Sequence, residues 1–189
     1  TRLGWDDNSI NIHEVAERLQ DIGVQALSIH GRTRAQLYKG EANWGPIAEV
    51  KNNPRITMPI FGNGDINSPE KALEYKNRYG IDGIMVGRAA IGYPWIFNEI
   101  KHYFKTGENL PQPTIADRVL AAKSHLEWAI EWKGLHVGIV EMRRHYTNYF
   151  KGIPGFKPYR HVLVTSDSAD ELYETFNVIT EVYEEFQFS

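Results

Sequence analysis

Two glycine-containing turns follow consecutive predicted strands, and each carries a polar residue suited to binding an anion. Gly62-Asn63-Gly64-Asp65 follows the first of these strands, and Gly87-Arg88 follows the second. Glycine lets the backbone approach a ligand closely, backbone N–H groups donate to an anion, and a following helix N-terminus favours negative charge. Arg88 would add a charge-assisted hydrogen bond. The two turns therefore predict a phosphate site. The alternative is a pair of tight turns with Arg88 solvated.

A third polar loop, His30-Gly31-Arg32-Thr33-Arg34, also follows a predicted strand. The ends of parallel strands meet at one edge of a sheet, so this loop should lie on the same side as the two glycine turns. His30 could donate to a flavin ring or a phosphate, and Arg32 and Arg34 could grip a backbone phosphate. The alternative is a polar surface loop. The nearby Trp44 is either packed in the core or stacked on a base.

Helices and strands alternate in the first half of the chain. Apolar spacing and turn residues predict helices at 11–22, 45–50, 69–79 and from about 89 or 94 to 104, and buried strands at 24–29, 59–61 and 84–86. Alternation with short connections predicts parallel strands joined by crossover helices. A doubly wound sheet and a (β/α) barrel share this order. Three strands cannot close a barrel, so in a barrel this part would be its C-terminal portion.

The second half is typical of helices alone. A linker with two prolines at 106–113 precedes helices predicted at 114–134, 137–150 and 168–186. The chain therefore divides into an α/β domain at 1–104 and a small all-α domain at 114–189. Basic residues interleaved with tyrosines suit a nucleic-acid backbone, although the aromatic side chains could equally be core. The candidates on this segment are Arg143, Arg144 and Lys151.

The composition excludes several classes of protein and site. The chain has 189 residues, of which 42% are hydrophobic, so it can build a core. Its net charge of −3 excludes a uniformly basic nucleic-acid binder. Without cysteine it has no disulfide, thiolate zinc site or cysteine nucleophile, and we expect no metal site. No apolar run reaches the ~18–20 residues of a membrane span. We expect a cytoplasmic protein.

The motifs together resemble a known enzyme family. His30-Gly31-Arg32-Thr33-Arg34, followed by Gln36, Tyr38, Gly40 and Ala42-Asn43-Trp44, is similar to a characteristic stretch of bacterial tRNA-dihydrouridine synthases. The segments 62–66 and 82–89 resemble that family's two FMN-phosphate loops, and 143–155 resembles its helical tRNA-binding domain. The match keeps its order and spacing over nearly the whole chain.

The resemblance implies a fold, a reaction and roles for individual residues. It implies a TIM barrel that binds FMN, followed by a helical domain; NADPH reduces the flavin, which passes a hydride to a uridine of tRNA. His30 would contact the flavin, and Arg32 and Arg34 would meet phosphate or tRNA. Two groups of residues follow the family's binding motifs: Asn63, Gly64, Asp65, Gly87 and Arg88 for the FMN phosphate, and Arg143, Arg144 and Lys151 for the tRNA backbone.

The chain also departs from the family pattern. The family's cysteine acid is absent, so no catalytic residue is assigned in this chain. A family lysine that contacts the flavin precedes a segment matched here by Thr1-Arg2-Leu3-Gly4-Trp5. We therefore expect the C-terminal part of such an enzyme, without turnover by itself and with weak or no FMN binding. We also expect self-association through an open edge of strand 24–29.

Two other functions remain open from the sequence. One is a different FMN-dependent TIM-barrel oxidoreductase acting on a small molecule, which would share the phosphate loops but have no use for a basic helical domain. The other is a non-catalytic module that binds phosphate or RNA.

Overall fold

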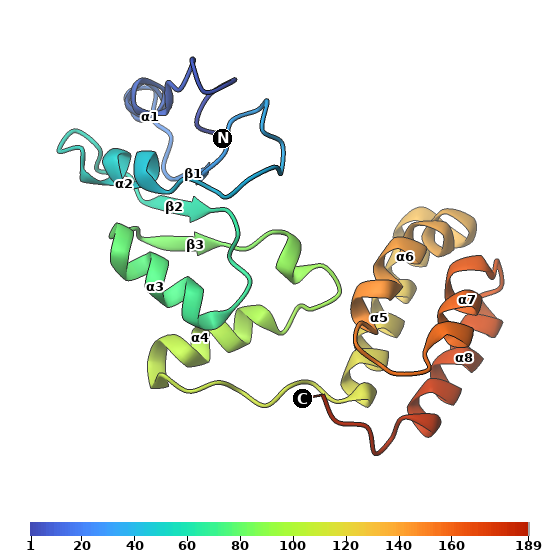
Figure 1. Ribbon diagram of the computed structural model, residues 1–189. Coiled ribbons are helices and arrows are strands. Elements are labelled where there is room, and N and C mark those ends of the chain that lie inside the picture. Colours follow the sequence, from blue (N-terminus) through green and yellow to red (C-terminus); the bar gives the residue numbers. More distant parts are fainter. Residues whose placement is uncertain (189) are drawn as a thin grey trace. The chain divides into compact units, whose positions relative to one another are not determined.

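The computed structural model describes residues 1–188, which form two compact units (Figure 1). The first unit is Thr1–Ala90 with Ile96–Asn109, and the second is Ile91–Trp95 with Leu110–Ser189. The sequence division at 104–114 falls close to the change between units at Asn109–Leu110. The segment Ile91–Trp95 differs from our expectation, because we placed it in the first domain. Trp95 packs against the core of the second unit instead.

A parallel three-stranded sheet organises the first unit, in the order β1 (Leu27–His30), β2 (Ile60–Asn63) and β3 (Gly83–Met85). The arrows of β2 and β3 lie side by side and point the same way in Figure 1. His30 pairs with Asn63, and Asn63 pairs with Met85, so the three strands end level with one another. The predicted parallel α/β class is confirmed. This register places the loops after the strands at one edge of the sheet.

Helices α1 (Ile12–Asp21), α2 (Gly45–Asn52), α3 (Pro69–Tyr79) and α4 (Ile96–Thr106) complete the unit, with a short 3-10 turn η1 (Arg88–Ala90). The predicted start of α3 is correct, since the Ser68 hydroxyl accepts from the Lys71 N–H as an N-cap. Strand β1 begins three residues later than predicted. Val24 donates to the Leu19 carbonyl in the turn that closes α1, so it is not free to pair.

The edge of β1 that we expected to be open is partly covered. Arg2 forms a parallel bridge with His30, and the Thr1 amino group donates to the Ser28 carbonyl at 2.8 Å. The His30 N–H donates in turn to the Thr1 carbonyl at 2.9 Å. The expectation of an unpaired edge is therefore wrong along these residues, because the first residues of the chain supply the missing partner. Self-association stays a prediction.

The second unit contains α5 (Ile115–Lys133), α6 (Leu135–Tyr149), α7 (Lys157–Thr165) and α8 (Ala169–Val182). The predicted capping box of Thr114 and Asp117 is present at the start of α5. Helix α7 was not predicted, because Leu163 is its only buried residue and so gives no apolar periodicity. Aromatic and aliphatic side chains from all four helices share one core. No helix of residues 1–188 is long and apolar enough to cross a membrane.

Candidate functional site

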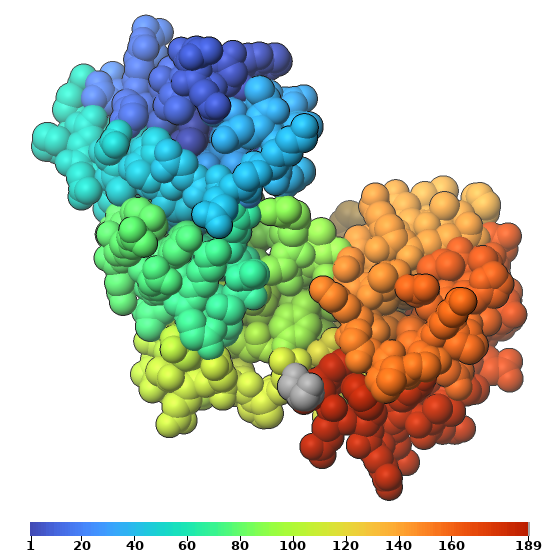
Figure 2. Space-filling view, in the orientation of Figure 1, coloured from blue at the N-terminus to red at the C-terminus, as the bar shows by residue number. Residues whose placement is uncertain are grey.

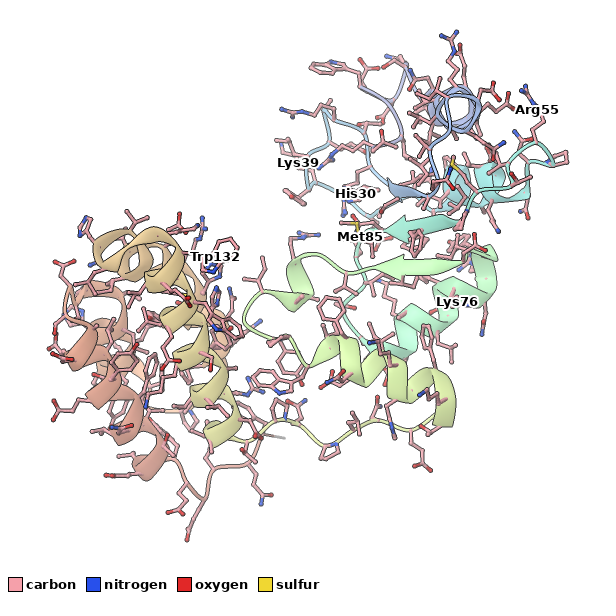
Figure 3. The ribbon with its side chains drawn as sticks, turned by 180° about the vertical axis from the view of Figure 1, so that it is seen from behind. His30, Lys39, Arg55, Lys76, Met85 and Trp132 are labelled. Carbon is pink, nitrogen blue, oxygen red and sulfur yellow. The ribbon has the colours of Figure 1, made fainter. Side chains whose placement is uncertain are left out.

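A cleft of about 760 Å³ opens at the carboxyl edge of the sheet in the first unit. Each strand contributes to it at its carboxyl end, since His30 is the last residue of β1, Asn63 is the last residue of β2 and Arg88 follows β3. Figure 3 shows His30 and Met85 beside each other at this edge, whereas Arg55 and Lys76 lie elsewhere on the unit. Residues far apart in the sequence therefore meet around one space, as the parallel order of the strands predicted.

Asp65 is the centre of the charged network in this cleft. Its carboxylate accepts from the Arg32 guanidinium at 2.9 and 2.8 Å, from the Ala42 N–H at 2.8 Å and from Arg88 at 3.0 Å. Burial alone would raise the pKa of Asp65, but the hydrogen bonds from Arg32 and Ala42 and the nearby guanidinium charges outweigh it, so the pKa is lowered. Asp65 is thus an anion surrounded by donors of its own chain.

Arg32 has a different environment from the one we expected. Its side chain is 2% exposed and its guanidinium bonds only to groups of the chain itself. The sequence analysis placed it against phosphate or tRNA because exposed loop arginines commonly bind such groups. The structure corrects this placement, since the Asp65 carboxylate already occupies the guanidinium. Arg34 is exposed, stacks 6.0 Å from the Trp5 ring and does not line the cleft.

Arg88 is the cation of this network that faces solvent. Its side chain is 55% exposed, and its guanidinium carbon lies 4.7 Å from the Tyr38 ring centroid. Asp65 and Tyr38 both contact the guanidinium, and its exposed N–H groups can donate to an anion in the cleft. Lys71 also lines the cleft, near the first turn of α3. Sequence reasoning missed Lys71, although its place three residues after the Ser68 cap was a usable signal.

Glycine serves a different purpose in each of the two turns, close packing at Gly64 and open space at Gly87. A side-chain carbon at Gly64 would come within 2.5 Å of the Ala42 side chain, and Gly64 has a φ of 129°, which favours glycine. Gly87 has no atom within 4 Å of the position a Cβ would take, so it borders open space. Asn63 donates from its amide to the Met85 carbonyl at 2.7 Å and ties β2 to β3. Two tight turns thus line the cleft.

His30 is electrically neutral at physiological pH. Burial, followed by the charges of Arg2, Arg32 and Arg88, lowers the pKa of His30 to about 4, although Asp65 acts in the opposite direction. His30 therefore enters the cleft as a neutral ring that donates through one nitrogen and accepts through the other.

The lowered pKa of His30 predicts a specific pH dependence. The unfolded state takes up a proton near pH 6.5, whereas the folded state resists it down to about pH 4. The contribution of His30 to stability is thus complete above pH 6.5 and is lost as the pH falls from about 6.5 to 4. We expect His30→Gln to flatten the fall in unfolding free energy over this range, as measured by urea unfolding at several pH values. An unchanged pH profile would contradict the assignment.

The predicted basic residues of the second unit separate into paired and unpaired groups. Arg143 donates to Asp167 at 2.6 Å and to the Ser166 carbonyl, so it joins α6 to the segment before α8. Arg144 is exposed and lies 4.0 Å from Glu141. Lys151 is exposed, and no acidic partner is found for it among residues 1–188. Arg143 therefore has a structural partner where we expected a ligand.

Lys151 lines a second hollow, of about 350 Å³, together with Lys157 and Arg160. These three are exposed, and none has an acidic partner within salt-bridge distance among the described residues. The space-filling view shows the orange segment between α6 and α7 at the surface of this unit (Figure 2). Three unpaired positive charges around one hollow suit a phosphate group. The sequence shows Lys157 and Arg160 in the same basic stretch, 141–160, as Lys151, but they were not among the residues predicted to contact tRNA.

Trp44 belongs to the core and not to a ligand site. It is 1% exposed, and its indole N–H donates to the Gly64 carbonyl at 3.1 Å. Its ring lies against Gly62, where an added side-chain carbon would come within 2.0 Å. Trp44 therefore supports the turn after β2 from beneath. Within residues 1–188, no group of three or more His, Cys, Asp or Glu side chains is placed to hold a metal ion.

Comparison with known proteins gives this cleft a family context. A family model described as "Dihydrouridine synthase (Dus)" matches residues 1–185. The chain belongs to the dihydrouridine synthase family. The resemblance drawn from the motifs is thereby confirmed, and the Dus match covers both units.

Curated relatives with tRNA-dihydrouridine synthase names cover most of this Dus chain. "Probable tRNA-dihydrouridine synthase 1" of Synechocystis is 46% identical over 171 residues, which is 90% of this chain and 47% of that protein. "tRNA-dihydrouridine synthase B" of Pseudomonas aeruginosa is 42% identical over 159 residues, or 84% of this chain and 47% of that protein. The chain thus spans about half the length of the curated relatives it matches.

Proposed function

We propose that the cleft of the first unit binds the phosphate end of FMN, as part of a flavin-dependent tRNA-dihydrouridine synthase. The meeting of His30, Asn63 and Arg88 around one space carries this proposal. The residues fit a phosphate, because Arg88 and Lys71 supply positive charge and the glycine turns allow a close approach. The proposal also assigns the α/β unit to the C-terminal portion of a TIM barrel, where phosphate sites follow the last strands.

Bound FMN would supply the hydride that reduces the uracil ring, with NADPH as the source of electrons. The residues of this chain have binding roles. Arg88 would neutralise the phosphate charge and fix the cofactor in the cleft, and the neutral His30 ring would donate a hydrogen bond to it. Asp65 would not touch the phosphate, because two anions repel; it holds Arg88 instead. With no cysteine, this chain supplies no proton to the uracil through a thiol.

We propose that the second unit contacts the backbone of tRNA through Lys151, Lys157 and Arg160. Cations without acidic partners keep their full charge for a phosphodiester, whereas Arg143 would first have to leave Asp167. Arg144 stays a candidate because its contact with Glu141 is long. This site would explain why an FMN-binding chain carries a helical unit with a basic hollow. Because tRNA, the proposed substrate, is found in the cytoplasm, we also propose that the protein is cytoplasmic.

Removing these three cations should weaken tRNA binding and its dependence on salt. The slope of log affinity against log salt is negative, and we expect the variant Lys151→Gln/Lys157→Gln/Arg160→Gln to reduce its magnitude by about 2 to 3, since each lost phosphate contact removes roughly 0.7 to 0.9. The measurement is tRNA binding by a full-length protein that carries this chain, between low and physiological salt. Lys123→Gln removes a charge that lies over the Tyr173 ring, and it should leave the slope unchanged. An unaltered slope in the triple variant would exclude this face.

A flavin assay separates this function from the two alternatives. We expect a full-length protein with this chain to be yellow, to oxidise NADPH and to bind tRNA. Flavin binding without salt-dependent tRNA binding would favour another FMN oxidoreductase that acts on a small molecule. A colourless protein that binds tRNA would favour a non-catalytic phosphate- or RNA-binding module.

A further inference from the structure

Arg32 is a buried arginine whose hydrogen bonds all end within its own chain. We propose that it is a positioning residue, which neutralises Asp65 so that Arg88 stays available to an anion and which fixes the hydrogen-bonding form of His30. The inference rests on the proposed FMN site. In this role Arg32 acts through Asp65 and His30; it does not contact the substrate, and it does more than fill space in the core.

The guanidinium of Arg32 has no donor left for a ligand. Its five N–H groups have five acceptors within range. Nε donates to the Lys39 carbonyl at 3.3 Å; Nη1 donates to Asp65 at 2.9 Å and to His30 Nε2 at 3.3 Å; Nη2 donates to Asp65 at 2.8 Å and to the Gly40 carbonyl. Lysine has three donors on a single atom and cannot reproduce this planar arrangement.

If Arg32 were absent, Arg88 would be the cation that neutralises the charge of Asp65. Both cations contact the same carboxylate, but Arg32 makes two short, buried bonds and Arg88 makes one exposed bond at 3.0 Å. Because Arg32 already neutralises Asp65, the charge of Arg88 remains effective toward the cleft. Without Arg32, Asp65 and Arg88 would form a neutral pair, and the cleft would lose its attraction for a phosphate.

The same guanidinium determines which nitrogen of His30 carries the proton. A guanidinium can only donate, so the Nε2 atom of His30 must accept. A neutral imidazole with an accepting Nε2 carries its hydrogen on Nδ1. Arg32 thus fixes Nδ1 as the donor that His30 can offer to a ligand.

The closing experiment compares FMN with riboflavin, which lacks the phosphate. A full-length protein carrying this chain is prepared as wild type, Arg32→Gln, and the double variant Arg32→Gln/Asp65→Asn, and dissociation constants are measured for both flavins. We expect Arg32→Gln to weaken FMN about tenfold through loss of effective charge and riboflavin by less than about twofold. The double variant also removes the carboxylate that would pair with Arg88, which frees the charge of Arg88, so we expect it to recover FMN affinity relative to Arg32→Gln.

A purely structural role for Arg32 would give different results. It predicts equal losses for FMN and riboflavin and no recovery in the double variant, and either outcome overturns the proposal. The ¹⁵N spectrum of His30 in the wild type is a further test that needs no substitution, because a proton on Nε2 would exclude the inferred contact. If the wild-type protein binds neither flavin, the proposed function fails. If the wild-type protein binds FMN, but the ratio of FMN affinity to riboflavin affinity is the same in Arg32→Gln as in the wild type, only the role of Arg32 fails.

Discussion

Replacing Arg88 by alanine should weaken FMN binding about 10- to 100-fold, since a hydrogen bond to a charged group contributes roughly 1.5–3 kcal/mol. Arg88 is the cation of the Asp65 network that faces the cleft, and no other side chain of the turn after β3 can replace its charge. The measurement is flavin retention during gel filtration together with a fluorescence titration of a full-length protein carrying this chain. Riboflavin affinity should change much less, because riboflavin has no phosphate.

Arg78→Ala is the matched control for Arg88→Ala. Arg78 is similarly exposed, at 64%, and pairs with Glu74 on α3, but it does not line the cleft. Both substitutions remove one arginine from the same unit, so a general effect of charge would appear in both. Unchanged FMN affinity in Arg88→Ala would show that the phosphate assignment is wrong, whatever the control does.

Replacing Trp44 by alanine should lower the unfolding free energy by about 3–5 kcal/mol, the usual cost of removing a large aromatic side chain from a core. The ring is fully enclosed between the sheet and the aromatic side chains of α3, stacking on Tyr79 at 5.7 Å and meeting Tyr75 edge-on at 4.9 Å. Its loss would also leave the Gly64 carbonyl without its indole donor. Urea unfolding followed by far-ultraviolet circular dichroism measures the effect without depending on tryptophan fluorescence.

Trp5→Ala provides the comparison for Trp44→Ala. Trp5 is in the same unit but 68% exposed, and its described partner is the stacked Arg34. We expect this substitution to cost less than about 1 kcal/mol, the value of an exposed cation–π contact. Equal effects of the two substitutions would contradict the buried, supporting position of Trp44.

Several features of the fold could be predicted from the sequence because they depend on short stretches of chain. The start of α3 follows from Ser68 and Pro69, and the start of α5 follows from the Thr114 capping box, since both caps act within one helical turn. The parallel order of the strands follows from their alternation with helices. The family could also be identified, because its motifs keep their order and spacing along the chain.

The environment of each charged side chain could not be predicted in this way. The sequence shows that Arg32, Arg34 and Arg88 are cations near strand ends, but burial and pairing distinguish them only after the loops have packed. The pairing of Arg143 with Asp167 likewise joins residues 24 positions apart. An ion pair of this kind depends on distance in space, and no local spacing rule gives it.

The sequence by itself thus determined the class of the fold, the family and the turns that can approach a phosphate. These follow from backbone preferences and apolar periodicity, which act over a few residues. Only the tertiary structure decided that Asp65 is the centre of the cleft's charges, that Arg32 is buried beside it, and that Lys157 and Arg160 line one hollow with Lys151. Those assignments depend on contacts between distant loops, because solvation and pairing set the chemical role of a charged group.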